Sequence, residues 1–207
     1  MPKVVDRAQR RRDISAAVRE LIDRDGLEAV TMSRVADRAR ISVGQVQHYF
    51  HAKEELLRHA FQSTMERTWE RVEKLTAANE ANKRPIRDGV VEGLETLLPL
   101  DAERTTDLKV RLAFLGAAAN RPAILEEYQE SQLHAIGRVA RAVTNGKECG
   151  EVPDGTDEHG EAVRLTALAN GLAFQILEPA AVTREEALDL LRRDVRRTFP
   201  HECRNWS

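Results

Sequence analysis

The sequence predicts an all-α fold, with a small N-terminal helical unit followed by a larger helical domain. Apolar residues recur at intervals of three and four along the whole chain, which is the spacing of one helix face. Alanine, leucine, arginine and glutamate dominate, and all four favour helices. Aromatic residues make up only 4% of the chain, and no long alternation of apolar and polar residues is present. We therefore expect helices and no strands.

Composition places the 207-residue chain among globular proteins, with 42% apolar and 32% charged residues. No apolar run approaches the roughly 20 residues that a membrane-spanning helix needs, and the charged N-terminal stretch lacks the apolar segment of a secretory signal. We therefore expect a cytoplasmic protein without a membrane partner. Its two cysteines, Cys149 and Cys203, are far apart in polar stretches and are expected to be reduced, although a disulfide stays open.

The net charge of −2 conceals an uneven distribution. Residues 1–60 hold 12 Lys and Arg against 9 Asp and Glu, whereas the remainder holds 20 against 25. This is a weak positive excess for a nucleic-acid-binding unit. The arginines at positions 7 and 10–12 are more informative, either as a solvated tail or as an arm that contacts phosphate.

The first 52 residues predict three helices, the last two joined as a helix-turn-helix. The first helix runs from about residue 6 to residue 25, and Gly26 is a natural stop. Thr31 is a good N-cap for a second helix, residues 40–42 interrupt the pattern, and Ser42 can cap a third. In that third helix Val46, Tyr49 and Phe50 fall on one side. The residues that point elsewhere can read base edges of DNA: Val43, Gln45, Gln47 and His48.

We expect two domains. Residues 1–52 form the DNA-binding domain, and residues 53–207 form the larger helical domain for ligand binding and dimerisation. Helices are expected over about 53–79, 86–98, 101–119, 123–143, 158–177 and 183–199. The glycine-containing stretch 145–157 is the longest loop signal. The last two helices carry broad apolar faces that fit either intramolecular core or a four-helix contact with a second copy. A short reading helix favours the homodimer, through Leu165, Leu172, Leu188, Leu191 and Val195.

The helix-turn-helix resembles the DNA-reading motif of the tetracycline-repressor (TetR) family. The resemblance lies in Thr31, Val35-Ala36, Ala39, Ile41-Ser42, Gly44, Tyr49-Phe50 and Lys53-Glu54-Glu55-Leu56-Leu57. A looser likeness to a TetR-family ligand domain lies in residues 97–101, 111–118 and 168–172. The resemblance implies a dimeric repressor that binds a palindromic double-stranded DNA operator and is released by a small-molecule effector.

The same resemblance implies roles for single residues. Val43, Gln45, Gln47 and His48 match the base-facing side of the motif, where a glutamine amide can pair with adenine. The positions expected to meet phosphate are Thr31, Ser42, Gly44, Tyr49 and Lys53. Two residues depart from the family pattern. Arg40 stands where glycine is usual, at a cost of about 1 kcal/mol if its backbone is left-handed, and Gln47 replaces a frequent tyrosine.

An effector site in the second domain requires an apolar cavity with a few polar groups. The candidate lining residues are Trp69, Leu98, Arg111, Phe114, Leu115, Tyr128, Asn170 and Phe174, with Asn120 and Gln175 as further polar partners. The mostly apolar set predicts a small, largely apolar effector. An alternative is a helix-turn-helix regulator without a ligand, whose second domain serves only dimerisation or protein partners.

An enzyme is not expected, because the sequence has no nucleophile elbow, phosphate-binding glycine loop or paired-cysteine zinc spacing. We predict no catalytic residues, no cofactor and no metal. His48 and His51 are expected to be polar residues on the DNA side, and His59 a surface residue. Their spacing does not place all three on one helix face.

Overall fold

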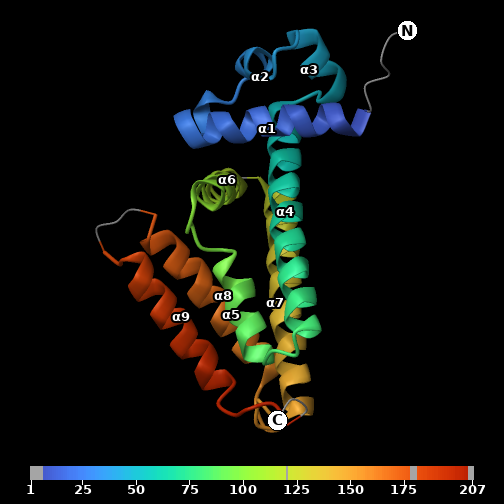
Figure 1. Cartoon of the computed structure of the whole chain (residues 1–207). Coiled ribbons are helices and arrows are strands. Elements are labelled where there is room, and N and C mark those ends of the chain that lie inside the picture. The colour runs from blue at the N-terminus through green and yellow to red at the C-terminus, as the bar shows by residue number, and fades with distance from the viewer. Residues whose placement is uncertain (1–6, 120, 178–180, 205–207) are drawn as a thin grey trace. The chain divides into compact units, whose positions relative to one another are not determined.

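The computed structural model describes residues 7–119, 121–177 and 181–204, and all regular structure in these ranges is helical (Figure 1). The elements are α1 (Arg7–Asp25), the short 3-10 helix η1 (Leu27–Ala29), α2 (Met32–Ala39), α3 (Val43–Tyr49), α4 (Lys53–Ala81), α5 (Ile86–Glu95), α6 (Ala102–Ala118), α7 (Pro122–Cys149), α8 (Glu158–Gln175) and α9 (Arg184–Thr198). The predicted all-α fold is confirmed. Among the described residues, no helix has both the length and the apolar composition needed to cross a membrane.

One helix boundary differs clearly from the prediction. α7 continues to Cys149, beyond the expected end near residue 143, so most of the irregular stretch starts only at Gly150. Gly146 lies inside this helix, and other side chains approach it closely. A Cβ there would lie 2.6 Å from Val152 and 2.8 Å from Phe199. This glycine permits packing, and it is not the helix breaker that its residue type suggested.

The chain forms two compact units. One comprises Met1–Arg67 with Thr106–Tyr128, and the other comprises Thr68–Thr105 with Gln129–Ser207. Helices α4, α6 and α7 therefore each have residues in both units. The expected boundary at residue 52 marks the end of the helix-turn-helix motif, whereas the two units are defined by which residues pack together. The boundary therefore stays a prediction.

The core of the first unit surrounds the helix-turn-helix. Ile14 and Val18 of α1, Val35 of α2 and Val46 of α3 have no exposed surface. Apolar residues of α4 and α6 extend this core, and the rings of Phe61 and Phe114 stack with centroids 4.0 Å apart. Helices α1 to α3 thus share their core with the helices that follow, since so small a unit cannot bury a large core alone.

The core of the second unit lies among α5, α8 and α9, and α8 and α9 run side by side (Figure 1). Each of the three helices contributes a stripe of apolar residues at helical spacing. The fully buried members of the cluster are Leu98, Val143, Leu165, Ala169, Ala187, Leu191, Val195 and Phe199. The broad apolar faces of α8 and α9 are therefore at least partly buried within their own chain.

Candidate nucleic-acid interface and ligand cavity

The turn between α2 and α3 is built around a non-glycine residue in the left-handed region. Arg40 has φ 55° and ψ 46°. Its N–H donates to the carbonyl oxygen of Asp37 at 3.2 Å, and the N–H of Ile41 donates to that of Ala36 at 3.0 Å. These two bonds form the Schellman pattern, which glycine usually completes. The left-handed conformation considered for Arg40 from the sequence is therefore present.

Side-chain caps start both helices of the motif. Thr31 Oγ1 accepts from the N–H of Arg34 at 3.2 Å, and Ser42 Oγ accepts from the N–H of Gln45 at 3.1 Å. Gln45 Oε1 accepts in turn from the N–H of Ser42 at 3.1 Å, which completes a capping box. The amide oxygen of Gln45, a predicted base-facing residue, is therefore engaged within α3 itself.

α3 buries one side and exposes the other. Val46 is fully buried, whereas Val43 is 39% exposed. All the predicted base-facing side chains are exposed: Val43, Gln45, Gln47 and His48. Gly44 is also exposed, and a Cβ there would meet nothing closer than the Ser42 hydroxyl at 4.0 Å. The backbone at Gly44 is therefore open to close approach by another molecule.

Arg11 of α1 fixes the C-terminal end of α3. Its Nη1 donates to the carbonyl oxygen of Tyr49 at 3.0 Å, and its guanidinium carbon lies 4.3 Å from the centroid of the Phe50 ring. A carboxylate oxygen of Glu55 lies 3.9 Å from the same nitrogen. The hydrogen bond and the cation–π contact together hold the reading helix on α1. Sequence reasoning missed this role, because Arg11 and Tyr49 are 38 positions apart.

Tyr49 and Lys53, two of the predicted phosphate contacts, are both partly exposed. The ring of Tyr49 meets that of His48 edge-on, with centroids 5.1 Å apart. Lys53 Nζ donates to the carbonyl oxygen of Leu27 at 3.4 Å. A phenol and an ammonium group in these positions can still turn towards a phosphate, so both contacts stay predictions.

His59 is not the surface residue that the sequence predicts. It is half-buried, its Nδ1 shares a hydrogen bond with the hydroxyl of the buried Ser15, and its ring lies 5.3 Å from that of Phe50. Burial lowers the pKa of His59 below 6.5, and the positive charge of Arg11 lowers it further. A neutral imidazole therefore supports the helix-turn-helix from inside the first unit.

Ion pairs join α6 to the helices around the motif. Asp107 of α6 is only 3% exposed, and its carboxylate pairs with Arg19 of α1 and, at 3.3 Å, with Arg67 of α4. Lys109 of α6 donates to the carbonyl and carboxylate oxygens of Asp23 in α1, at 3.0 and 2.7 Å. A displacement of α6 would have to break these contacts or move α1 with it.

The second unit contains a cavity of about 400 Å³, within the range of small-molecule sites. It is lined by residues of α4, α5, α7 and α8. Apolar lining comes from Val72, Val90, Leu94, Leu97, Ala135 and Val139, beside the indole of Trp69. Polar lining includes Asn79, His134, Arg138, Arg141, Asn145 and Thr166.

Residues 14–60 match the tetR family of bacterial regulatory proteins, and residues 86–200 match the C-terminal domain of BetI-type transcriptional repressors. The second match alone covers more than half of the chain. The chain belongs to the TetR family. It is a helix-turn-helix transcriptional regulator of the BetI type and not an enzyme.

Named relatives of this TetR-family chain agree with that assignment. The regulator PksA of Bacillus subtilis is 25% identical over 186 residues, covering 89% of this chain and 87% of PksA. The regulator BetI of Paraburkholderia phytofirmans is 32% identical over 126 residues, covering 60% of this chain and 62% of BetI. A transcriptional regulator from Rhodococcus sp. Rha1 shares the fold with a TM-score of 0.79, at 23% identity over 92% of this chain and 96% of that one. A structure from Saccharomonospora viridis, solved in complex with choline, has a TM-score of 0.77 at 22% identity, covering 95% and 98% of the two chains.

Of the eight predicted pocket residues of this TetR-family regulator, Trp69 lines the cavity. Leu98 is fully buried in the core of the second unit. Arg111, Phe114 and Tyr128 lie in the first unit, where the ring of Phe61 stacks on Phe114 and lies 6.2 Å from that of Tyr128. Asn170 donates to Gln132 at 3.1 Å. The remaining two are exposed, Leu115 by 39% and Phe174 by 59%, as is Gln175. Asn120 lies outside the described residues.

The predicted dimer residues of the regulator are mainly core residues of their own chain. Leu165, Leu191 and Val195 have no exposed surface, Leu172 has 6%, and Leu188 packs against the same cluster. Fully buried side chains offer no area to a second copy, whereas Leu188 is only partly buried. The dimer contact through these residues stays a prediction. The exposed stripe of α8 is a different set: Val163, Ala167, Gly171 and Phe174.

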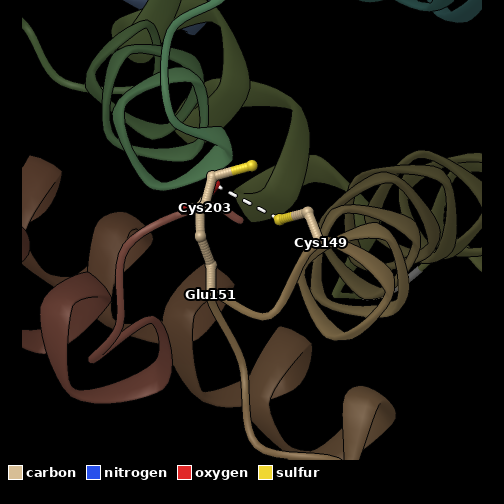
Figure 2. Close-up of side chains that lie close together, drawn as sticks. All are labelled: Cys149, Glu151 and Cys203. Atoms are coloured by element: carbon tan, nitrogen blue, oxygen red, sulfur yellow. Dashed lines mark hydrogen bonds between the residues drawn. The ribbon is translucent and has the colours of Figure 1, made fainter. Parts of the chain in front are cut away.

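The two cysteines are buried together, contrary to the polar surroundings that the sequence suggests. Their Sγ atoms and a carboxylate oxygen of Glu151 lie within 4.8 Å of one another, and Cys149 donates to Glu151 at 3.5 Å (Figure 2). The Glu151 carboxylate also accepts from the N–H groups of Ile86 and Arg87 at 2.8 and 2.9 Å, which caps α5. Thiols and a carboxylate are zinc ligands, but three donors are one fewer than structural zinc uses. We assign the cluster to holding α5, the end of α7 and the C-terminal segment together.

Proposed function

We propose that this TetR-family regulator represses transcription as a homodimer on a two-fold symmetric operator and leaves the DNA when a small molecule occupies the cavity. The observation that carries the DNA-binding part is the surface of α3. Its amide and apolar side chains are exposed, while Arg11 and the buried Val46 fix the helix on its support. A helix held in this way can enter a major groove without rearranging its own unit. The protein would act in the cytoplasm, where its DNA is.

The proposed base contacts can be tested at Gln47. Its side chain is exposed on α3, and the capping box does not involve it. A bidentate glutamine–adenine pair contributes about 1–3 kcal/mol of discrimination. We expect Gln47→Ala to weaken operator binding about tenfold or more and to change binding to random DNA little. An equal loss on both DNAs would show that Gln47 only positions the protein.

The dimer is proposed to form through the exposed stripe of α8. Val163, Ala167, Gly171 and Phe174 follow helical spacing, and Phe174 alone is 59% exposed. Gly171 has open space around its Cα, so a second helix can approach closely there. Gly171→Arg should give a monomer in analytical ultracentrifugation, whereas the α9 control Arg193→Glu should stay dimeric. A dimeric Gly171→Arg protein would show that the contact lies elsewhere.

Release by an effector is supported by the way that helices connect the two units. Trp69 and Val72 of α4 and Arg138 of α7 line the cavity, and both helices continue into the first unit. Within that unit, α4 and α6 are tied to α1 through Asp107. Effector and operator would then weaken each other by linkage.

The operator itself tests the whole proposal. Selection of bound sequences from a random DNA pool should give inverted half-sites with centres about 34–36 Å, or one helical turn, apart. Enrichment of no sequence, or of a single unrepeated half-site, would contradict it. A regulator that binds its operator but no small molecule across a broad panel would instead favour the ligand-free alternative.

A further inference from the structure

Two residues that line the cavity each have a buried polar atom without a hydrogen-bond partner within the described residues. Asn79 is 7% exposed and Thr166 is 3% exposed, and neither Asn79 Oδ1 nor Thr166 Oγ1 forms a hydrogen bond there. A buried polar atom without a partner costs free energy, so nearly all such atoms in folded proteins are satisfied. Both residues line the cavity, but these two atoms themselves have almost no surface open to it, so the charged side chains of the wall are the better guide to a ligand.

The orientation of the Asn79 amide is fixed by its surroundings. Its Nδ2 donates to the carbonyl oxygen of Pro85 at 3.0 Å, and a Cβ at position 89 would lie 2.9 Å from that nitrogen. The glycine at 89 therefore makes room for the amide, and the bond to Pro85 identifies which end is the nitrogen. Oδ1 is buried beside it and has almost no surface open to the cavity.

The charge of the wall is positive. Arg138 and Arg141 both line the cavity, together with His134, whereas the wall holds one carboxylate, Glu80. Arg138 stands over Trp69, with its guanidinium carbon 5.9 Å from the ring, and its nearest acid is the exposed Glu73 at 3.7 Å. Arg141 pairs with no acid among the described residues. Two guanidinium groups favour an anion and oppose a cation in the same space.

We propose that the cavity binds an organic anion with an apolar, largely aromatic body. Its carboxylate or sulfonate would accept hydrogen bonds from Arg141 and Arg138, and its body would pack against Leu94, Leu97 and Val139. This proposal deepens the proposed function, since it takes the cavity as the effector site and names the effector class. It also separates this chain from the Saccharomonospora viridis protein, which was solved in complex with choline, a cation.

A matched pair of fluorescent probes tests the charge directly. 8-Anilino-1-naphthalenesulfonate and N-phenyl-1-naphthylamine have the same two-part aromatic body, and only the first carries a sulfonate. Both would be titrated into the full-length protein without DNA. We expect the sulfonate probe to bind at least tenfold more tightly than the neutral probe, and choline at millimolar concentration to displace neither.

Substitutions then locate the site. Arg141→Gln should weaken the sulfonate probe about tenfold and change the neutral probe less than twofold, whereas Arg193→Gln on the exposed side of α9 should change neither. Gly93→Leu, which places a side chain in the cavity, should abolish both signals while the circular dichroism spectrum stays helical. Equal affinity for the two probes, an unaffected sulfonate probe in Arg141→Gln, or displacement by choline would each overturn the proposal. Failure of the proposed DNA function would appear separately, as a random pool without enrichment while the probes still bind.

Discussion

Replacing Arg40 by glycine should stabilise the protein, and the gain can be worked out from the turn. Arg40 is in the left-handed region, with φ 55° and ψ 46°, where a Cβ costs about 1–2 kcal/mol. Glycine removes that cost and keeps both backbone bonds of the Schellman pattern. The unfolded glycine chain gains conformational freedom, which offsets roughly 0.5–1 kcal/mol. The expected net stabilisation of Arg40→Gly is therefore about 0.5–1 kcal/mol.

Arg40→Ala is the matched control for this substitution. Alanine keeps the Cβ and with it the backbone strain, but it removes the guanidinium group as glycine does. In urea unfolding, Arg40→Gly should be more stable than Arg40→Ala by about 0.5–1 kcal/mol, since the same glycine entropy offsets the strain, with a midpoint temperature roughly 1–4 °C higher for a chain of this size. Equal stabilities of the two variants would refute the assignment of strain to this turn.

The same two variants show why an arginine is present at a strained position. If the guanidinium group of Arg40 contacts a phosphate, both variants should bind operator more weakly, and the slope of log affinity against log salt should fall by about 1. If both variants bind the operator as tightly as the wild type, Arg40 has no role in DNA binding. The stability comparison would be unaffected, because it is measured without DNA.

Three further predictions concern buried groups. His59 is neutral when folded, so the stability that its lowered pKa confers is present above pH 6.5 and is lost as the pH falls. Acid titration of unfolding should show this loss for the wild type and less of it for His59→Gln. Burial raises the pKa of Cys149 to about 12, so iodoacetamide at pH 8 should alkylate it about a hundredfold or more slowly in the folded than in the unfolded protein; similar rates would contradict its burial. Asp107→Asn should cost about 3 kcal/mol in urea unfolding, because Arg19 and Arg67 lose their shared carboxylate, and a loss below about 1 kcal/mol would show a solvated cluster.

Local patterns predicted the features that depend on neighbours in the chain. The caps by Thr31 and Ser42 and the left-handed turn at Arg40 follow from residues within four positions of one another. The helical periods likewise predicted the fold. Gly146 shows the limit of this reasoning, because a helix-breaking residue type and a site of close packing look the same in one sequence.

Features that depend on distant contacts were not predictable in the same way. Arg11 lies in a run of similar arginines, and only the fold brings it to the end of α3. Phe114 and Leu98 have the apolar character of pocket residues, but a buried side chain in a core and one beside a cavity have the same residue type. Two polar residues that line the cavity, Asn79 and Thr166, come from α4 and α8. The spacing of apolar residues in either helix does not indicate that these two residues line the same cavity.

The capping box of α3 makes Gln45 less available than Gln47 for contacts with DNA bases. Gln45 accepts the N–H of Ser42 through its amide oxygen, so a bidentate contact with adenine, which needs that oxygen, would require it to leave the box. Losing a cap costs about 1 kcal/mol, comparable to what the base contact contributes. Gln47 bears the same amide on the exposed side of α3 without this competing bond. Gln47, with the exposed methyl groups of Val43 beside a thymine, should therefore discriminate operator from random DNA more than Gln45 does.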